Sequence, residues 1–156
     1  MSSTSSAAVV IGIGNSWAGD DAAGVLVARA LRGNLPEGVA LVEHEGEPTA
    51  LIDAWAGKKL AVVVDATRGG TPPGTLRCFD ASSAPLPAAY AGASTHAFTL
   101  AQAIELARGV GRLPPRLLVL GIEGAVFEAG AEPLPAVAGA IEPAARKVVD
   151  LVRTYY

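Results

Sequence analysis

The sequence predicts a three-layer α/β/α fold built on a mostly parallel, twisted five-stranded sheet with one antiparallel edge strand. Three observations support this prediction. Short, continuous runs of valine, leucine and isoleucine are typical of strands that are covered on both faces. Helix-periodic segments lie between most of these runs, as parallel crossover connections require. One strand-like segment, Gly74–Asp80, follows a Gly/Pro-rich link that is too short for a crossover helix and is therefore expected to be antiparallel.

The expected elements follow one another in a strand and helix rhythm. The first strand runs from about Val9 to Ile13, and the first helix from about Asp20 to Arg32, with Gly33 as a stop signal. Residues 81–93 are rich in alanine, serine, proline and glycine, so we expect an irregular, mobile loop there. The remaining elements are expected at residues 39–43 (strand), 49–55 (helix), 60–65 (strand), 74–80 (strand), 98–108 (helix), 116–122 (strand) and 134–152 (helix).

Composition limits the classes of protein that the chain can belong to. Its 156 residues, 51% hydrophobic and 17% charged, suffice for one domain with a full core. We expect residues 1–7 to be a disordered tail and residues 8–156 to form a single α/β domain. A formal charge of −3 gives no basic surface for nucleic acid. The apolar runs are shorter than the roughly 20 residues that span a bilayer, so no membrane segment is expected.

The chain contains one cysteine, Cys78, which excludes an intramolecular disulfide and favours a reducing compartment, the cytoplasm. Cys78 lies in a strand-like alternation without a histidine beside it in the sequence. Because free cysteine is commonly buried, we interpret it as a packing residue.

Three groups with metal-binding chemistry fall at the carboxyl ends of predicted strands, where open α/β sheets usually bind ligands. The pair Asp20 and Asp21 follows the first strand, Asp65 ends the third, and His96 lies before or in the first turn of a later helix. Two carboxylates and one imidazole suit an open site for zinc or nickel. Each residue also has a structural interpretation, because acids cap helices and form turns and a lone histidine is often solvated. Spacing alone does not decide between these interpretations.

Other interpretations of the same region are weaker. Gly12-Ile13-Gly14 follows a strand, as in a dinucleotide-binding turn, but Trp17 stands where the third glycine belongs, and the acidic pair would repel a pyrophosphate. His44 lies in an acidic loop after the second strand; it is an alternative ligand, although a solvated loop is the simpler interpretation. The sequence contains neither a G-x-S-x-G nor an H-E-x-x-H motif.

Four groups of residues follow one another along the chain and together carry a resemblance. They are Gly12-Ile13-Gly14-Asn15 with Gly19-Asp20-Asp21, then Val64-Asp65-Ala66, then Ser94-Thr95-His96, and finally Gly121-Ile122-Glu123. In order and separation they look like the signatures of the [NiFe]-hydrogenase maturation endopeptidases, from about Val9 to Val152. The loop after the second strand departs from the small-residue pattern that is frequent in that family, so which hydrogenase is served stays open.

The resemblance implies a cytoplasmic endopeptidase that removes the C-terminal extension of a hydrogenase large-subunit precursor after nickel insertion. It implies that Asp21, Asp65 and His96 bind the metal and serve catalysis, and that Asp20 shapes the turn. Nickel would arrive with the substrate, other divalent ions could occupy the site in vitro, and we expect a monomer. Whether the metal is a Lewis acid or only a recognition element stays open. The alternative is a non-catalytic nickel-binding checkpoint module, with a small-molecule hydrolase more remote.

Overall fold

The computed structural model describes residues 6–87, 90 and 95–156, except for the side chains of residues 95–99. Most of the expected N-terminal tail therefore lies outside the described residues. The strands in the described part are β1 (Ala8–Ile13), β2 (Val39–His44), β3 (Leu60–Thr67), β4 (Leu76–Asp80) and β5 (Arg116–Glu123). The helices there are the 3-10 turn η1 (Gly19–Ala22), α1 (Ala23–Leu31), α2 (Pro48–Trp55), α4 (Thr95–Gly109), α5 (Pro135–Ala138) and α6 (Ile141–Tyr155).

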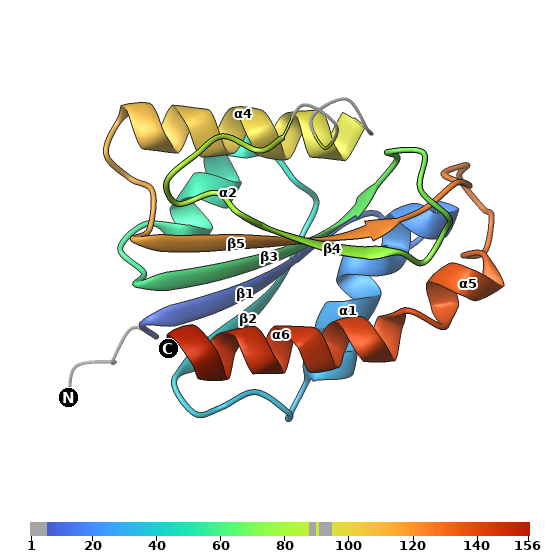
Figure 1. The fold of residues 1–156 in the computed structure, drawn as a ribbon, viewed down its shortest axis with the longest axis horizontal. Helices are drawn as coiled ribbons and strands as arrows, with labels where there is room; N and C mark the ends of the chain where they lie inside the picture. Colours follow the sequence, from blue (N-terminus) through green and yellow to red (C-terminus); the bar gives the residue numbers. More distant parts are fainter. Residues whose placement is uncertain (1–5, 88–89, 91–94) are drawn as a thin grey trace.

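The strands form one sheet in the order β2-β1-β3-β5-β4. The first four of these pair in parallel, and β4 pairs with β5 in antiparallel fashion at the edge. Helices α1 and α6 cover one face and α2 and α4 cover the other, which gives three layers (Figure 1). The predicted fold class is therefore confirmed. No helix in the described part of the chain is both long and apolar enough to cross a membrane.

Side chains that alternate along the strands divide the core into two halves. On β3, Val62 and Val64 belong to the half beneath α1 and α6, whereas Ala61 and Val63 belong to the half beneath α2 and α4. Every residue of β3 is buried, which explains why its first five residues, Leu60–Val64, form an unbroken apolar run rather than an alternating one. By the same alternation, Asp65 faces the side of α2 and α4.

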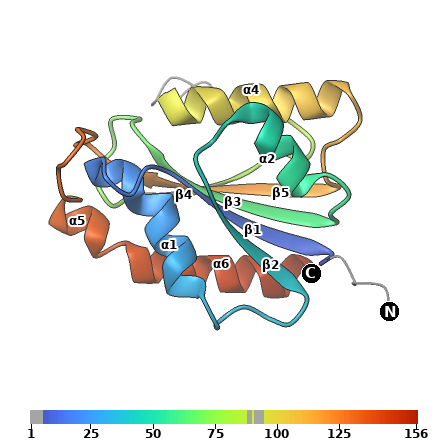
Figure 2. The same cartoon turned by 180° about the vertical axis from the view of Figure 1, so that it is seen from behind.

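The strand order reverses between β1 and β3, because the chain leaves β1 for β2 on one side and returns to β3 on the other. The carboxyl ends of the strands at such a point frame the usual ligand site of an open α/β sheet. The turn η1, the end of β3 and the first turn of α4 all lie at this end of the molecule, and the C-terminus lies at the other (Figures 1 and 2).

The predicted end of the third strand is wrong. β3 continues past Asp65 to Thr67, because Thr67 still pairs with Glu123 of β5. Asp65 is therefore a position within a buried strand and not the first residue of a turn.

Two helix starts also differ from the prediction. Asp20 and Asp21 form the separate 3-10 turn η1, and α1 begins only at Ala23. The later helix, α4, begins at Thr95, three residues before its predicted start, so His96 lies in its first turn. Both boundaries lie at the end of the molecule where the site was predicted.

The single closing helix that was predicted over residues 134–152 is in fact two helices. The chain leaves α5 after Ala138 and starts α6 at Ile141. Pro143 explains the break, because it has no N–H to donate to the carbonyl of Gly139 in a continuous helix. As the third residue of α6 it falls in the first turn, where N–H groups have no partner within the helix.

The edge strand and the loop after it also test the predictions. Cys78 is exposed, so its interpretation as a packing residue is wrong. It lies on the edge strand β4, which α6 covers only partly, and pairs with Leu120 of β5. Residues 81–87 form an irregular loop, as expected, and bury Leu86. Residues 88–89 and 91–94, on which much of the mobile-loop prediction falls, lie outside the described residues.

Candidate functional site

Glycines let the start of α1 lie directly on the sheet. A Cβ atom on Gly12 would collide with the carbonyl oxygen of Gly24, and one on Gly24 would collide with the carbonyl oxygens of Ile13 and Val64. The N–H of Gly14 donates to the carbonyl of His44 at 3.0 Å, which ties the turn after β1 to the end of β2. Because only glycine fits such close approaches, the turn that carries both acids is held against the strand ends.

Asp20 is a fully buried clamp between this turn and the loop that follows β5. Its Oδ2 accepts the N–H groups of Ala125 and Val126 at 2.7 and 2.9 Å, and its Oδ1 accepts the N–H of Leu134 at 2.7 Å. Such bonds to a carboxylate are among the stronger hydrogen bonds in proteins. Asp20 therefore has the structural role expected of it, but its partners lie 105 to 114 residues away rather than in its own turn.

Asp21 is also buried, with 5% of its surface exposed. Its Oδ2 accepts the N–H of Asn15 at 3.1 Å, so the carboxylate is held toward the first part of the turn. The turn η1 packs against β3, which carries Asp65. The structure thus places Asp21 and Asp65 on adjoining elements at the same edge of the sheet.

Asp65 is fully buried and lies beside a buried tyrosine, Tyr90. Tyr90 comes from the segment between β4 and α4, and its ring packs against Gly121, the neighbour of Asp65 on β5. It also meets the ring of Phe79 edge to face, with the centroids 5.2 Å apart. Burial and then the charge of Asp65 raise the pKa of Tyr90 well above its ordinary value of 10.0. The phenol therefore remains a hydrogen-bond donor next to a carboxylate.

Glu123 is a second buried clamp, at the end of β5. Its carboxylate accepts the N–H of Gly69 at 2.7 Å, the N–H of Gly70 at 3.2 Å and the hydroxyl of Thr67 at 3.2 Å. Arg77 adds a positive charge 4.0 Å away. These contacts hold the loop after β3 and thereby the strand end next to Asp65.

His96 lies in the first turn of α4 at the same end of the sheet, but its side chain lies outside the described residues. Within the described part of the chain, no three His, Cys, Asp or Glu side chains gather closely enough to hold a metal ion. His44 is among the residues that this result covers, so it does not gather with Asp21 and Asp65 into such a group. The set of Asp21, Asp65 and His96 stays a prediction.

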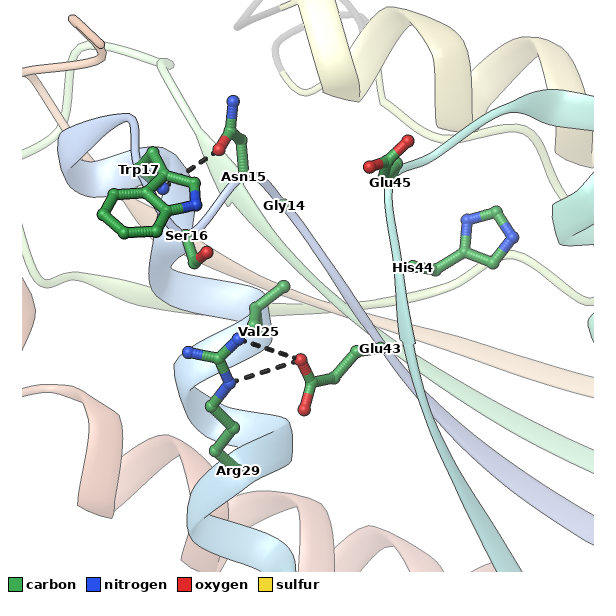
Figure 3. Close-up of a pocket in the computed structure, with 9 residues that line it drawn as sticks. All are labelled: Gly14, Asn15, Ser16, Trp17, Val25, Arg29, Glu43, His44 and Glu45. Atoms are coloured by element: carbon green, nitrogen blue, oxygen red, sulfur yellow. Dashed lines mark hydrogen bonds and ion pairs between the residues drawn. The ribbon is translucent and has the colours of Figure 1, made fainter. Parts of the chain in front are cut away.

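His44 instead lines a groove of about 620 Å³ between the turn after β1 and the end of β2 (Figure 3). Its Nδ1 accepts the N–H of Gly46 at 2.8 Å. Arg29 and Glu43 face each other across the groove at 3.1 Å, and the imidazole of His44 points away from them (Figure 3). Trp17, on the turn, is 78% exposed. The groove is lined by Gly14, Asn15, Ser16, Trp17, Val25, Arg29, Glu43, His44 and Glu45.

Tyr90 was missed by the sequence reasoning. Residues 81–93 are dominated by small residues and proline, and Tyr90 is the one aromatic residue among them. An aromatic residue in such a segment is a weak signal of a buried anchor, and nothing in the local sequence points to Asp65. The pairing depends on the register of β3 and β5, which brings Gly121 beside Asp65.

The model of the hydrogenase maturation protease family matches residues 25–151. The hydrogenase expression/formation protein HupD of Thiocapsa roseopersicina is 28% identical over 117 residues. The matched region is 74% of this chain and 53% of HupD, so the chain spans about half the length of that relative.

Solved structures agree in fold. The hydrogenase maturating endopeptidase HybD from E. coli is 26% identical with a TM-score of 0.82, and the match covers 94% of this chain and 92% of HybD. A solution structure of an E. coli endopeptidase gives 27% identity and the same TM-score and coverage. The [NiFe] hydrogenase maturation protease HycI from Thermococcus kodakarensis KOD1 is 23% identical with a TM-score of 0.67. The match covers 97% of this chain and 95% of HycI, and at this identity it supports the fold alone.

Proposed function

Because the chain belongs to the hydrogenase maturation protease family, we propose that it is an endopeptidase that removes the C-terminal extension of a [NiFe]-hydrogenase large-subunit precursor after nickel insertion. The observation that carries the proposal is the placement of Asp21 and Asp65, two buried acids on adjoining elements where the strand order reverses. The first turn of α4, which carries His96, lies at the same end of the sheet.

In this proposal the precursor brings the nickel, and Asp21, Asp65 and His96 complete its coordination. Two carboxylates and an imidazole form a donor set that nickel and zinc accept. The three ligands come from three separate elements, so they bind an ion only weakly by themselves, and the precursor supplies the rest of the coordination shell. A precursor without nickel lacks this anchor, and its scissile peptide is not held in place.

The groove beside the turn gives the extended substrate a place to lie. The groove opens next to Asn15, whose N–H donates to Asp21. Its walls carry positively and negatively charged side chains and the exposed indole of Trp17. Exposed tryptophans contribute strongly to binding when a partner covers them. We therefore place the polypeptide around the scissile bond along this groove.

Cleavage of a defined precursor tests the proposal. The purified protein is incubated with nickel-loaded and nickel-free precursor, and mass spectrometry detects the shortened product. We expect cleavage of the loaded form only. Asp21→Asn and His96→Ala should abolish it, whereas Asp53→Asn, which changes an exposed acid on α2, should not. No cleavage of the loaded cognate precursor by the wild-type protein would refute the protease function.

The same experiment separates the two roles of the metal and the alternative function. If the bound ion polarises the peptide carbonyl, exchanging nickel for zinc in the precursor changes kcat at saturation. If the ion only anchors the precursor, the exchange changes KM. Tight binding of the loaded precursor without cleavage would identify a checkpoint module instead. We further propose that the protein acts in the cytoplasm as a monomer, and size-exclusion chromatography with light scattering checks the monomer.

A further inference from the structure

The packing around Tyr90 leaves its ring little freedom to turn. The side chain is fully buried, meets Phe79 edge to face, and lies so close to the backbone that a Cβ on Gly121 would come within 3.2 Å of its Cε2. Gly121 pairs in register with Asp65 on the neighbouring strand. The absence of a side chain at position 121 thus creates the space in which the phenol approaches Asp65.

The hydroxyl group of Tyr90 makes no hydrogen bond of ordinary geometry in the described part of the chain, although it lies close enough to interact with the carboxylate of Asp65. An unsatisfied buried hydroxyl costs about 1–3 kcal/mol. Phenylalanine would fill the same space without this cost. The hydroxyl is therefore better explained by a hydrogen bond that forms when Asp65 takes up its working orientation.

We propose that Tyr90 is a positioning residue for Asp65, whose hydroxyl donates to one carboxylate oxygen and so directs the other oxygen toward the metal-bearing end of the substrate. The inference rests on the ligand role of Asp65 in the proposed function. Carboxylate ligands of metals are themselves held by hydrogen bonds, and loss of such a partner typically lowers metal affinity or activity by about 10–100-fold. Tyr90 is a donor that the packing holds beside this carboxylate.

The variant Tyr90→Phe removes the hydroxyl and keeps the contacts of the ring. Zn²⁺ alone is the probe, and its affinity is measured by calorimetric titration of the full chain, with Asp65→Asn as the reference for a lost ligand. We expect Tyr90→Phe to weaken Zn²⁺ binding about 10-fold or more and to leave the melting temperature at or above that of the wild type. Tyr156→Phe is the control, because its hydroxyl donates to the carbonyl of Gly38 and the C-terminus lies at the end of the molecule opposite the site (Figure 1).

The outcomes separate this inference from the proposed function. Equal Zn²⁺ affinity in Tyr90→Phe and the wild type would show that Tyr90 only fills space, and it would overturn the inference even if the wild type cleaves the precursor. Equal affinity in Asp65→Asn and the wild type would also overturn it, because Asp65 would not be a ligand. Weaker binding by Tyr90→Phe in a protein that fails to cleave any loaded precursor would support the inference and refute the protease function.

Discussion

Asp20 and Asp21 are neighbours with the same chemistry, yet the structure predicts opposite consequences for replacing them. An asparagine at position 20 can keep one oxygen toward Ala125 and Val126, but its NH₂ group then faces the N–H of Leu134. The charge-assisted bond from the N–H of Leu134 is lost, and two donors then face each other there. The bonds from Ala125 and Val126 are weakened, because the amide oxygen carries no full charge. The expected cost is about 3 kcal/mol, which lowers the melting temperature of a chain of this size by about 6–12 °C.

Asp21→Asn should behave differently. Its side-chain oxygen accepts the N–H of Asn15 at 3.1 Å, and the amide oxygen of asparagine can keep this bond. We expect a change of less than about 1 kcal/mol in the free energy of unfolding, as for most substitutions that leave packing intact. Processing of the nickel-loaded precursor should nevertheless be lost, because an amide oxygen is a much poorer metal ligand than a carboxylate.

Differential scanning calorimetry and the cleavage assay on the same preparations test the pair. Asp20→Asn, assayed well below its melting temperature, should retain cleavage in proportion to its folded fraction. The reasoning fails if Asp20→Asn melts within about 1 °C of the wild type, which is under 1 kcal/mol for this chain length. It fails equally if Asp21→Asn is the less stable of the two or cleaves at the wild-type rate.

Three further predictions follow from the described contacts. Glu123→Gln should cost about 2 kcal/mol, because it weakens the bonds that hold the loop after β3; calorimetry and faster amide exchange of that loop would show it. Trp17→Ala should leave stability unchanged and raise KM for the precursor about 10-fold, which steady-state cleavage measures. The pKa of Glu43 is lowered from its ordinary value of 4.5, and the hydrogen bond from Arg29 is the largest cause. The ion pair therefore stabilises the fold fully above pH 4.5, and this stabilisation is lost as the pH falls through the lowered pKa. Carboxyl NMR titration should show this shift, and Arg29→Met should reverse part of it, because Arg32 also binds Glu43, at 2.6 Å.

The sheet could be predicted from the sequence because its strands are covered on both faces. The run Leu60–Val64 has no polar position, so burial on both sides follows from local composition alone. The link before β4 was short enough to exclude a crossover helix, which predicted an antiparallel edge strand, and β4 is antiparallel to β5 at the edge. The strands and their order along the chain depend on such local signals, and both were predicted correctly.

Boundaries and polar contacts at the site depend on distant residues. β3 extends past Asp65 because Glu123 of β5 continues the pairing, and the local sequence contains no sign of this partner. Asp20 is indistinguishable from a helix cap until residues 125–134 are placed beside it. Tyr90 lies close to Asp65 because the register between β3 and β5 brings Gly121 beside Asp65. The contacts that fix the roles of these residues could therefore not be predicted from the local sequence, and the ligand set of Asp21, Asp65 and His96 stays a prediction from family resemblance.

The clamp formed by Asp20 has a consequence for the order in which the protein assembles during synthesis. The three N–H groups that bind this carboxylate belong to residues 125–134, whereas β1, β2 and β3 are complete by residue 67. Closing so long a segment is a slow, non-local step that needs the rest of the sheet first. While Leu134 is still inside the ribosome, the nascent chain lacks at least this hydrogen-bond partner of Asp20. The Asp20 clamp therefore closes only after residue 134 has been made.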